Sequence, residues 1–403
     1  MTQIITPNLA SPQFKANPHP FYARLRAEAP VYCAKLPNRQ MAWLVTRYDD
    51  VLAVLKDERF AKDRLNIAGP GQAAKQPWIP GLFKPLSRNM LDLDGQDHAR
   101  LRTLVHKVFT PRRVEQLRAQ IQTRCDQLLT KAQPTGSVAL IREYALALPV
   151  AIIAELLGIP SEDRHKFHRW SRSMTSVSSA TDVLRVIPAI WLFTRYLRAL
   201  FKRRRADPRD DLVTALVQTE EAGDMLNEDE LLAMVVLLLI AGHETTVNLI
   251  GSGTLALLQH PDQIELLRQN AALIKPAVEE LLRYCSPVDL ATERYAREDI
   301  TIGDVTIPRG EMVLGVLGSA NRDERLFANP DRLDITRDPN RHLAFGHGIH
   351  FCLGAPLARL EGQIAINTLL QRVPNLRLKQ APETLRWRKE LFLRGLEQLP
   401  VAC

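Results

Sequence analysis

One cysteine in a glycine-rich stretch is the strongest chemical feature of this chain. The stretch FGHGIHFCLG, Phe345 to Gly354, places Cys352 close to Gly346, Gly348 and Gly354. Glycines in such a run mark tight turns or a close approach of the backbone to a ligand. The thiol is therefore either a functional group beside a ligand or an inert side chain in a turn. The stretch alone leaves both interpretations open.

A second polar feature interrupts the most apolar part of the chain, where LLAMVVLLLIA is followed directly by GHETT. A carboxylate and two threonines inside an apolar helix are locally unfavourable, because a buried Glu loses hydration and Thr competes for backbone hydrogen bonds. Leu237, Ala241 and Thr245 are four residues apart and share one helical face. Thr245 can bond the Ala241 carbonyl and bend the helix. Either Glu244 faces water, or the polar residues form a notch in an apolar cavity wall, beside a site that handles protons.

Three further groups of residues have spacings that permit chemistry. Glu280 and Arg283, in EELLR, are three residues apart on a predicted helix and can pair. Arg332, in NPDRL, lies in an irregular segment where an arginine could complete a buried network. His98 and Arg102, in HARLR, share a helical face and can present two donors to an anion. Each group is more often a solvated surface feature than a site.

Composition and charge exclude several classes of protein. Five scattered cysteines without C-x-x-C spacing indicate neither a disulfide framework nor a zinc site. The net charge of +8 is spread along the chain, and its densest run, KRRRADPRDD, is diluted by acids and proline, so we expect no nucleic-acid partner. The N-terminus has no signal-peptide pattern, and the apolar run is shorter than the roughly 20 residues that span a bilayer. We expect a soluble, cytoplasmic protein without a membrane anchor.

Helical periodicity covers most of the sequence, and strand signals are few and short. The predicted helices are 20–29, 48–57, 111–132, 141–158, 161–177, 188–205, 227–259, 275–284 and 353–373. One strand is predicted at 41–46, and a hairpin at 299–315 turns at Gly303 and Asp304, with a third strand after Gly310. Two long irregular regions, 60–89 and 321–345, are expected to be functional. The chain is predicted to be one domain, 1–403, with 1–15 as a flexible N-terminal tail.

Taken together, these motifs resemble one family, the cytochromes P-450, and specifically its soluble bacterial members. FGHGIHFCLG matches the family's haem-ligand signature F-G-x-G-x-H-x-C-x-G at every specified position. AGHETT matches the oxygen-activation motif, EELLR the E-x-x-R pair, and HARLR the propionate-contacting motif. One departure is Leu333, where the family usually has Phe. The resemblance implies a mainly α cytochrome P-450 fold, a single large helical domain with small β-sheets and the haem between the long central helix and the Cys-ligand loop.

The resemblance also assigns roles to individual residues. Cys352 would be the axial thiolate of haem b, and the helix that follows it would favour negative charge on the sulfur. Glu244 and Thr245 would be the acid–alcohol pair that delivers protons. Glu280, Arg283 and Arg332 would form a structural triad. The remaining cofactor contacts implied are His98, Arg102, Arg294, His350, Phe345, Gly346 and Ala241. The implied substrate pocket comprises Leu237, Ile240, Ala241 and Leu290, with parts of 76–90 and 391–393.

The function implied is haem-thiolate monooxygenation of a hydrophobic small molecule with O2. The motifs extend over nearly all 403 residues and leave no flavin or iron–sulfur segment, so electrons are expected from a ferredoxin and its reductase. The basic residues expected to dock that acidic partner are Arg100, Lys107, Arg112, Arg113 and Arg359. Two alternatives stay open at this point, a peroxide-driven peroxygenase and a non-catalytic haem-based gas sensor or carrier.

Overall fold

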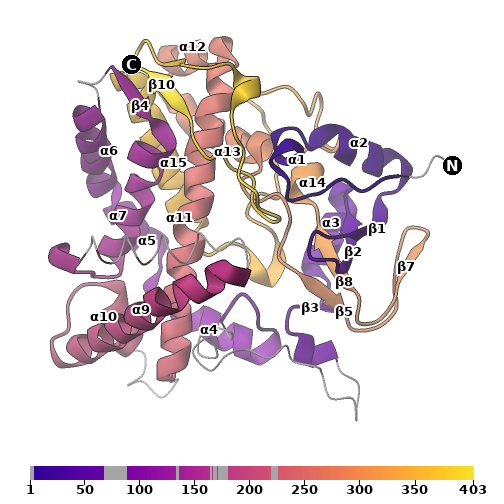
Figure 1. The fold of residues 1–403 in the computed structure, drawn as a ribbon, viewed down its shortest axis with the longest axis horizontal. Coiled ribbons are helices and arrows are strands. Elements are labelled where there is room, and N and C mark those ends of the chain that lie inside the picture. Colours follow the sequence, from indigo (N-terminus) through magenta and orange to yellow (C-terminus); the bar gives the residue numbers. More distant parts are fainter. Residues whose placement is uncertain are drawn as a thin grey trace. The chain divides into compact units, whose positions relative to one another are not determined.

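The computed structural model of the chain describes residues 4–67, 89–132, 136–163, 166, 170, 180–218 and 226–403 (Figure 1). The chain divides into two compact units. The first consists of Met1–Ala74, Ile121–Leu146 and Thr245–Cys403, and the second of Lys75–Gln120 and Ala147–Glu244. The expectation of one domain therefore stays a prediction, and each unit is described by itself.

The first unit contains the sheets. Five strands in the order β1 (Val31–Lys35), β2 (Met41–Val45), β8 (Met312–Gly315), β5 (Arg294–Ala296) and β3 (Phe60–Ala61) form the largest. In Figure 1 the indigo strands β1 and β2 lie next to the orange β8 and β5, so this sheet joins early and late parts of the sequence. A second sheet has the order β4 (Ser137–Ala139), β10 (Pro400–Ala402) and β9 (Arg377–Leu378). The third is the hairpin of β6 (Ile300–Ile302) and β7 (Val305–Ile307).

The predicted strands are confirmed, because their local signals are strong. The 41–46 prediction corresponds to β2, and the hairpin turns at Gly303, whose φ of +58° suits glycine. The third strand is β8, which leaves the hairpin and pairs parallel to β2 and antiparallel to β5. All four β8 residues are buried, as expected for a central strand.

The helices of the first unit come before, between and after these strands in the sequence. The N-terminal ones are α1 (Pro12–Ala16), α2 (His19–Glu28) and α3 (Tyr48–Lys56), and most of α6 (Arg118–Ala132) also belongs to this unit. A π-helical turn at Ile141–Ala145 follows β4. The later helices are α12 (Pro261–Gln269), α13 (Ile274–Cys285), α14 (Leu317–Ala320) and α15 (Ala355–Arg372).

The segment expected to be a flexible tail is partly packed. Ser11 caps α1 by accepting a hydrogen bond from the Phe14 backbone N–H, and Leu9, Phe14 and Lys15 are buried. The Lys15 ammonium lies 2.6 Å from the Asp289 carboxylate. These contacts tie the chain to the fold from Leu9 onward, contrary to a flexible tail over the whole of 1–15.

The second unit is helical in its described residues. It contains α4 (Gly95–Val108), α5 (Pro111–Gln116), α7 (Ala147–Leu156), α9 (Ala180–Ala206) and α10 (Leu212–Gln218). Arg204 of α9 ties this unit together, because it donates to Asp211 at 2.5 Å and to the Gly158 carbonyl at 2.6 Å.

The long helix α11 (Glu228–Leu258) contributes to both units. The predicted capping box is confirmed: the Asn227 N–H donates to Glu230 at 2.9 Å, and the Glu230 N–H donates to the Asn227 side chain at 2.8 Å. In the described part of the chain, α11 is the one helix that is long and apolar enough to cross a membrane by length and composition alone. Most of its apolar stretch is buried, as in the core helix of a soluble protein.

Several predicted helix boundaries were wrong. The single helix expected at 111–132 is interrupted at Leu117, between α5 and α6, and 141–158 divides into the π-turn and α7. Helix α9 begins at Ala180 and contains Pro188, which was expected to start it. Of the helix predicted at 161–177, Ser161–Asp163 form a 3-10 turn and most of the rest lies outside the described residues. The predicted set did not contain α1, α4, α10, α12 or α14.

Candidate functional site

The loop that carries Cys352 leads directly into α15. The Cys352 N–H donates to the Phe345 carbonyl at 3.0 Å, and the Gly346 N–H donates to the Leu343 carbonyl at 2.8 Å, which closes the loop on itself. Cys352 is half-buried and precedes the first residue of the 18-residue helix by three positions. The positive end of that helix dipole favours negative charge on the sulfur.

Glycine is required at two points of this loop. Gly346 and Gly348 have φ values of +68° and +72°, in the left-handed region. A Cβ at Gly348 would lie 2.7 Å from the Leu55 carbonyl oxygen, which is backbone and cannot turn aside. The glycine spacing noted in the sequence therefore brings the loop against α3.

An ion-pair cluster on α13 holds the start of the loop. Glu279 accepts from Arg359 at 2.7 and 2.9 Å and lies 3.0 Å from His342 Nε2. The Arg359 guanidinium also lies over the Phe345 ring, 4.5 Å from its centroid. Burial alone would raise the pKa of Glu279, but His342 and Arg359 outweigh it and lower this pKa to about 2. Sequence reasoning missed both residues: Glu279 begins the EELLR motif but was given no role of its own, and His342 lies outside every motif.

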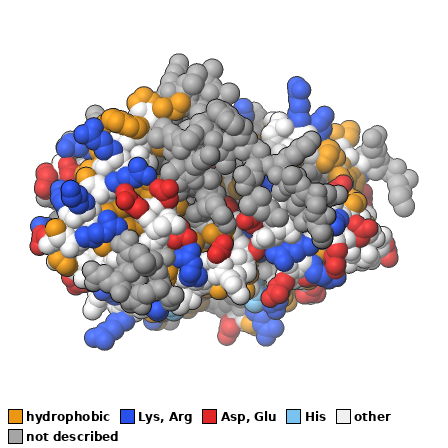
Figure 2. Space-filling model, turned by 90° about the horizontal axis from the view of Figure 1, so that it is seen from below, with side chains coloured by type: hydrophobic (Ala, Val, Ile, Leu, Met, Phe, Trp, Pro, Cys, Tyr) orange, Lys and Arg blue, Asp and Glu red, His pale blue; other side chains and the backbone are white. Residues whose placement is uncertain are grey.

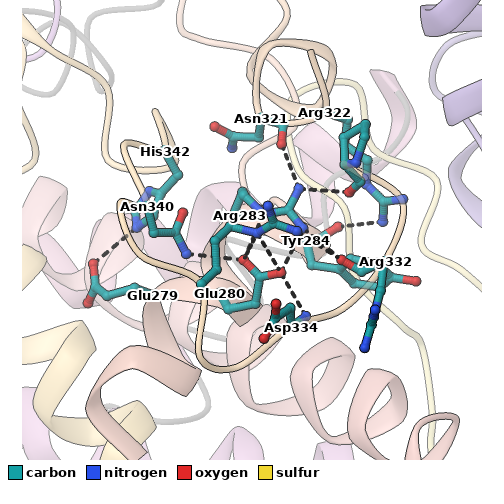
Figure 3. A network of polar contacts seen from close by, with 12 residues as sticks. Glu279, Glu280, Arg283, Tyr284, Asn321, Arg322, Arg332, Asp334, Asn340 and His342 are labelled. Carbon is teal, nitrogen blue, oxygen red and sulfur yellow. Dashed lines mark hydrogen bonds and ion pairs between the residues drawn. The ribbon is translucent and has the colours of Figure 1, made fainter. Parts of the chain in front are cut away.

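The E-x-x-R pair is the centre of a buried network (Figure 3). Glu280 and Arg283 are fully buried, and two N–H···O bonds of 2.7 Å join them. Arg283 also donates to the carbonyls of Asn321 at 2.9 Å and Pro330 at 2.8 Å. The pair therefore fastens α13 to the irregular segment 321–345, which was predicted to be functional.

The prediction that Arg332 completes a triad with Glu280 and Arg283 was wrong. Arg332 has an exposed side chain that points away from Glu280 in Figure 3, and only its backbone carbonyl accepts from Arg283, at 3.2 Å. Arg337 supplies the second guanidinium instead, with Nε 3.2 Å from Glu280 Oε2. Leu333 is buried in the core beside α13. This position is therefore packed even though Leu replaces the Phe that is usual in the motif.

Three further predicted site residues lie in the first unit. Arg294 is buried on β5 and donates to the carbonyls of Val54 at 3.2 Å and Leu55 at 3.4 Å. His350 ends the 3-10 turn Gly348–His350 within the cysteine loop. Leu290 is fully buried and forms an isolated bridge with Val316.

Helix α11 exposes one stripe of an otherwise buried surface. Ile240 is 38% exposed, Ala241 is exposed, and Leu237, Glu244 and Thr245 are half-buried. Neighbours on the other faces, such as Val236, Leu239, His243 and Thr246, are buried. Glu244 and Thr245 are thus accessible beside apolar side chains, and both alternatives for Glu244, a water-facing carboxylate or part of a polar notch, stay open. The predicted bond from Thr245 to the Ala241 carbonyl stays a prediction.

The predicted anion-binding pair lies on α4. His98 is buried and Arg102 is half-buried, one turn apart. Burial first, and then the Arg102 charge, lower the pKa of His98. His98, Arg102, Leu237, Ile240, Ala241 and Glu244 belong to the second unit, and the other site residues to the first.

Glu361 is a buried carboxyl that sequence reasoning missed. It lies on α15, is 1% exposed, and has the Thr246 side chain of α11 beside it. Burial raises the pKa of Glu361 to about 8, and Thr246 opposes this only in part. The one available signal was a lone Glu between Leu360 and Ile364 on an apolar stripe, which is ambiguous on a helix surface.

Not all of the basic residues expected to dock a partner carry an uncompensated charge. Arg359 is bound to Glu279, and Arg100 forms an ion pair with Glu230. Arg112 and Lys107 are exposed. Lys and Arg side chains lie among Asp and Glu side chains on the face shown in Figure 2.

The residues present fit a haem. Among the residues that the structure describes, no three His, Cys, Asp or Glu side chains are grouped as a metal cluster. In the first unit, a cysteine thiol just before a helix N-terminus and buried cationic donors such as Arg294 suit the iron and the carboxylates of a haem. In the second unit, the exposed apolar stripe of α11 suits its ring.

Comparisons with known proteins agree with this chemistry. Residues 5–390 match the family described as Cytochrome P450. The polyketide biosynthesis cytochrome P450 PksS of Bacillus subtilis (strain 168) is 47% identical over 393 residues, 97% of this chain and 96% of that protein. Its solved structure has a TM-score of 0.91 and 45% identity, over 98% of this chain and 99% of that one. The vitamin D(3) 25-hydroxylase of Pseudonocardia autotrophica is 47% identical over 395 residues, 98% of this chain and 96% of that protein.

A further solved structure, P450BioI in complex with a hexadec-9Z-enoic acid ligated acyl carrier protein, has a TM-score of 0.86 and 41% identity, over 97% of this chain and 99% of that one. This chain belongs to the cytochrome P450 family. The mainly α fold expected from the motifs is confirmed, and the chain is a haem-dependent monooxygenase that takes its electrons from separate redox partners. The peroxygenase and gas-sensor alternatives are not favoured, since its relatives are named as hydroxylases and epoxidases.

Proposed function

We propose that Cys352 is the thiolate ligand of haem b, and that the enzyme oxygenates a hydrophobic small molecule of the polyketide or acyl-chain type. The observation that carries this proposal is the loop that presents the Cys352 thiol, half-buried, at the N-terminal end of α15. Its contact with α3 leaves no room for a side chain at Gly348. When bound, a haem with a thiolate ligand supplies the activation of O2.

The remaining site residues hold the cofactor and move protons. Arg294, His350, His98 and Arg102 can donate to the propionate carboxylates. Phe345 and Gly346 shape the loop against the ring, and Ala241 lies on the exposed stripe of α11. On that stripe, Glu244 can accept a proton from water and Thr245 can pass one on through its hydroxyl, because both side chains are half-buried rather than enclosed.

The substrate class follows from the apolar side chains that share the stripe. Leu237, Ile240 and Ala241 are aliphatic, and we assign Leu290 to the same pocket. The similarity to PksS and to the acyl-carrier-protein complex supports a polyketide or an acyl chain. A compound panel tests this assignment, because a substrate that displaces water from the iron shifts the Soret band of the ferric enzyme from low to high spin. Polyketide and acyl compounds should give that shift, and a shift confined to small polar compounds would contradict the assignment.

We assign a ferredoxin and its reductase as the electron donors, in the cytoplasm. Arg112 and Lys107 are the exposed cations suited to an acidic partner. The electron-transfer rate should fall as ionic strength rises, since salt screens exposed charges. A rate that is independent of salt would contradict the docking site.

The ligand assignment is tested by the spectrum of the reduced enzyme with carbon monoxide. The wild type should show the red-shifted Soret band of thiolate ligation, and Cys352→His should lose it. Cys33→Ser is the matched control, because Cys33 is also a half-buried free thiol and lies on β1. A normal band in Cys352→His would refute the assignment.

A further inference from the structure

The ion pair of Glu279 and Arg359 lies against the loop that carries Cys352, within the first unit. Arg359 donates to Glu279 through Nε at 2.7 Å and through Nη2 at 2.9 Å, and this two-bond geometry fixes the plane of the guanidinium. The side chains of Arg359 and Glu279 are 32% and 27% exposed. Water therefore screens these two charges only in part.

Glu279 is held in place from a second side by His342. The Nδ1 atom of His342 accepts from the Ala344 backbone N–H at 3.2 Å, so the ring proton is on Nε2, which lies 3.0 Å from the Glu279 carboxylate and donates to it. Burial alone would raise the pKa of Glu279, but the bonds from His342 and Arg359 lower this pKa to about 2. Glu279 is therefore ionised at neutral pH.

The Arg359 guanidinium reaches the cysteine loop through Phe345. It lies 4.5 Å from the centroid of the Phe345 ring, whose face attracts a cation. The Phe345 carbonyl oxygen accepts the Cys352 N–H at 3.0 Å. Phe345 thus contacts the Arg359 cation with its ring and the Cys352 backbone with its carbonyl.

The two charges of the pair act in opposite directions on an electron that arrives at the site. Reduction of a haem adds one negative charge, which a nearby cation favours and a nearby anion opposes. At an effective dielectric constant of about 20, a unit charge roughly 10 to 15 Å away changes such an equilibrium several-fold. One ring contact, one phenylalanine and one hydrogen bond separate Arg359 from Cys352, so the separation is of this order.

We propose that the Glu279–Arg359 pair sets the reduction potential of the haem. The Arg359 charge raises the potential from beside the cysteine loop, and the Glu279 charge offsets most of that increase. This role rests on the proposed ligation by Cys352. It assigns the potential against which a redox partner must deliver its electron to two named side chains.

Spectroelectrochemical titration of the haem-loaded variants tests this role. Arg359→Gln should lower the potential, so that the ratio of reduced to oxidised haem at the wild-type midpoint falls at least about threefold. Glu279→Gln should raise that ratio by a similar factor, because the Arg359 charge is then no longer offset. Both substitutions break the same ion pair, so a pair that only braced the loop would shift the two potentials in the same direction. Shifts of equal sign, or unchanged potentials, would overturn the proposal.

Two further variants separate charge from packing. Arg359→Lys keeps the charge but loses the planar fork, and its ratio of reduced to oxidised haem should stay within about twofold of wild type. The double variant Glu279→Gln/Arg359→Gln leaves neither charge unpaired, so it should fold and bind haem even if a single variant does not. Its ratio should also stay within about twofold of wild type, because the two opposing effects are removed together. A shift in either variant as large as that expected of Arg359→Gln would refute the proposal.

Arg372 and Asp126 form the matched control pair. Arg372 lies on the same helix as Arg359, its Nη1 is 3.1 Å from Asp126 Oδ1, and its side chain is 30% exposed. The helical rise places it about 20 Å farther from Cys352 than Arg359. Arg372→Gln should therefore leave the potential unchanged, and a shift equal to that of Arg359→Gln would count against the proposal.

The carbon monoxide spectrum of the same samples distinguishes failure of this role from failure of the ligand assignment. Absence of the thiolate band in the wild type would refute ligation by Cys352. A normal thiolate band with unchanged potentials in both single variants would refute the ion-pair role alone.

Discussion

The Arg337 Nε lies 3.3 and 3.2 Å from the two carboxylate oxygens of Glu280, the same two oxygens that accept from Arg283. Glu280 also accepts from the Asp334 N–H at 3.0 Å and from Asn340 at 3.1 Å. The buried Glu280 carboxylate thus holds the irregular segment that leads to the cysteine loop, and Arg337 is the second cation, after Arg283, that balances its charge.

Truncation of the Arg337 side chain should destabilise the fold, whereas truncation of the Arg332 side chain should not. Arg337→Ala leaves Glu280 with one cation and should lower the free energy of unfolding by about 2 kcal/mol or more. Arg332→Ala keeps the backbone carbonyl that accepts from Arg283. It should change the free energy of unfolding by less than about 0.5 kcal/mol. Urea unfolding of the haem-loaded variants measures both changes in the free energy of unfolding. A larger loss in Arg332→Ala than in Arg337→Ala would show that Arg332, not Arg337, completes the triad.

Gly348 should be irreplaceable by alanine. The Cβ of Gly348→Ala would collide with the Leu55 carbonyl at a residue whose φ is +72°, so the cysteine loop must move. We expect most of the haem content to be lost. Gly303→Ala has a similar φ of +58° but meets no atom within 4 Å, and should cost only the backbone strain of about 1–2 kcal/mol. Haem absorbance per protein measures the difference, and equal haem contents would refute the loop argument.

Thr245 should govern coupling rather than binding. Thr245→Ala keeps the apolar stripe, so haem and substrate should still bind, but loss of the hydroxyl should slow proton delivery by on the order of 10²- to 10⁴-fold. NADH would then be consumed while hydrogen peroxide accumulates. The ratio of product to NADH reports this effect. Thr254→Ala, on the same helix, is the control and should keep the wild-type ratio. An unchanged ratio in Thr245→Ala would show that the Thr245 hydroxyl only packs in the helix and does not deliver protons.

Glu361 should make the enzyme less stable as pH rises. Burial raises its pKa from 4.5 to about 8, so between these values the folded protein retains a proton that the unfolded chain releases. Its contribution to stability is therefore fully present below pH 4.5 and is lost as pH approaches 8, at up to about 1.4 kcal/mol per pH unit. Urea unfolding at pH 5.5 and 7.5 should show a smaller pH dependence in Glu361→Gln than in wild type. Glu265→Gln, at an exposed position on α12, should retain the wild-type dependence.

The sequence predicted those features that depend only on residues a few positions apart. The capping box at Asn227, the turn at Gly303 and the strained glycines around Cys352 all act within a few positions, and each appears as expected. The choice of Arg337 over Arg332 depends on how an irregular segment turns after Asn329, whose φ is +48°, and spacing cannot specify that turn. Glu361 became distinctive only once α11 placed Thr246 beside it. The interruption at Leu117 was missed because the apolar periodicity continues across it.

The pairing of β2 with β8 and of β4 with β10 has a consequence for how the protein is made. Each pair joins a strand from the first 140 residues to one synthesised after residue 311. On the ribosome, β2 and β4 therefore wait with open hydrogen-bonding edges until most of the chain has been translated. A stalled or cleaved chain would present these edges to other chains, so slow translation late in the message should promote aggregation of the unfinished product.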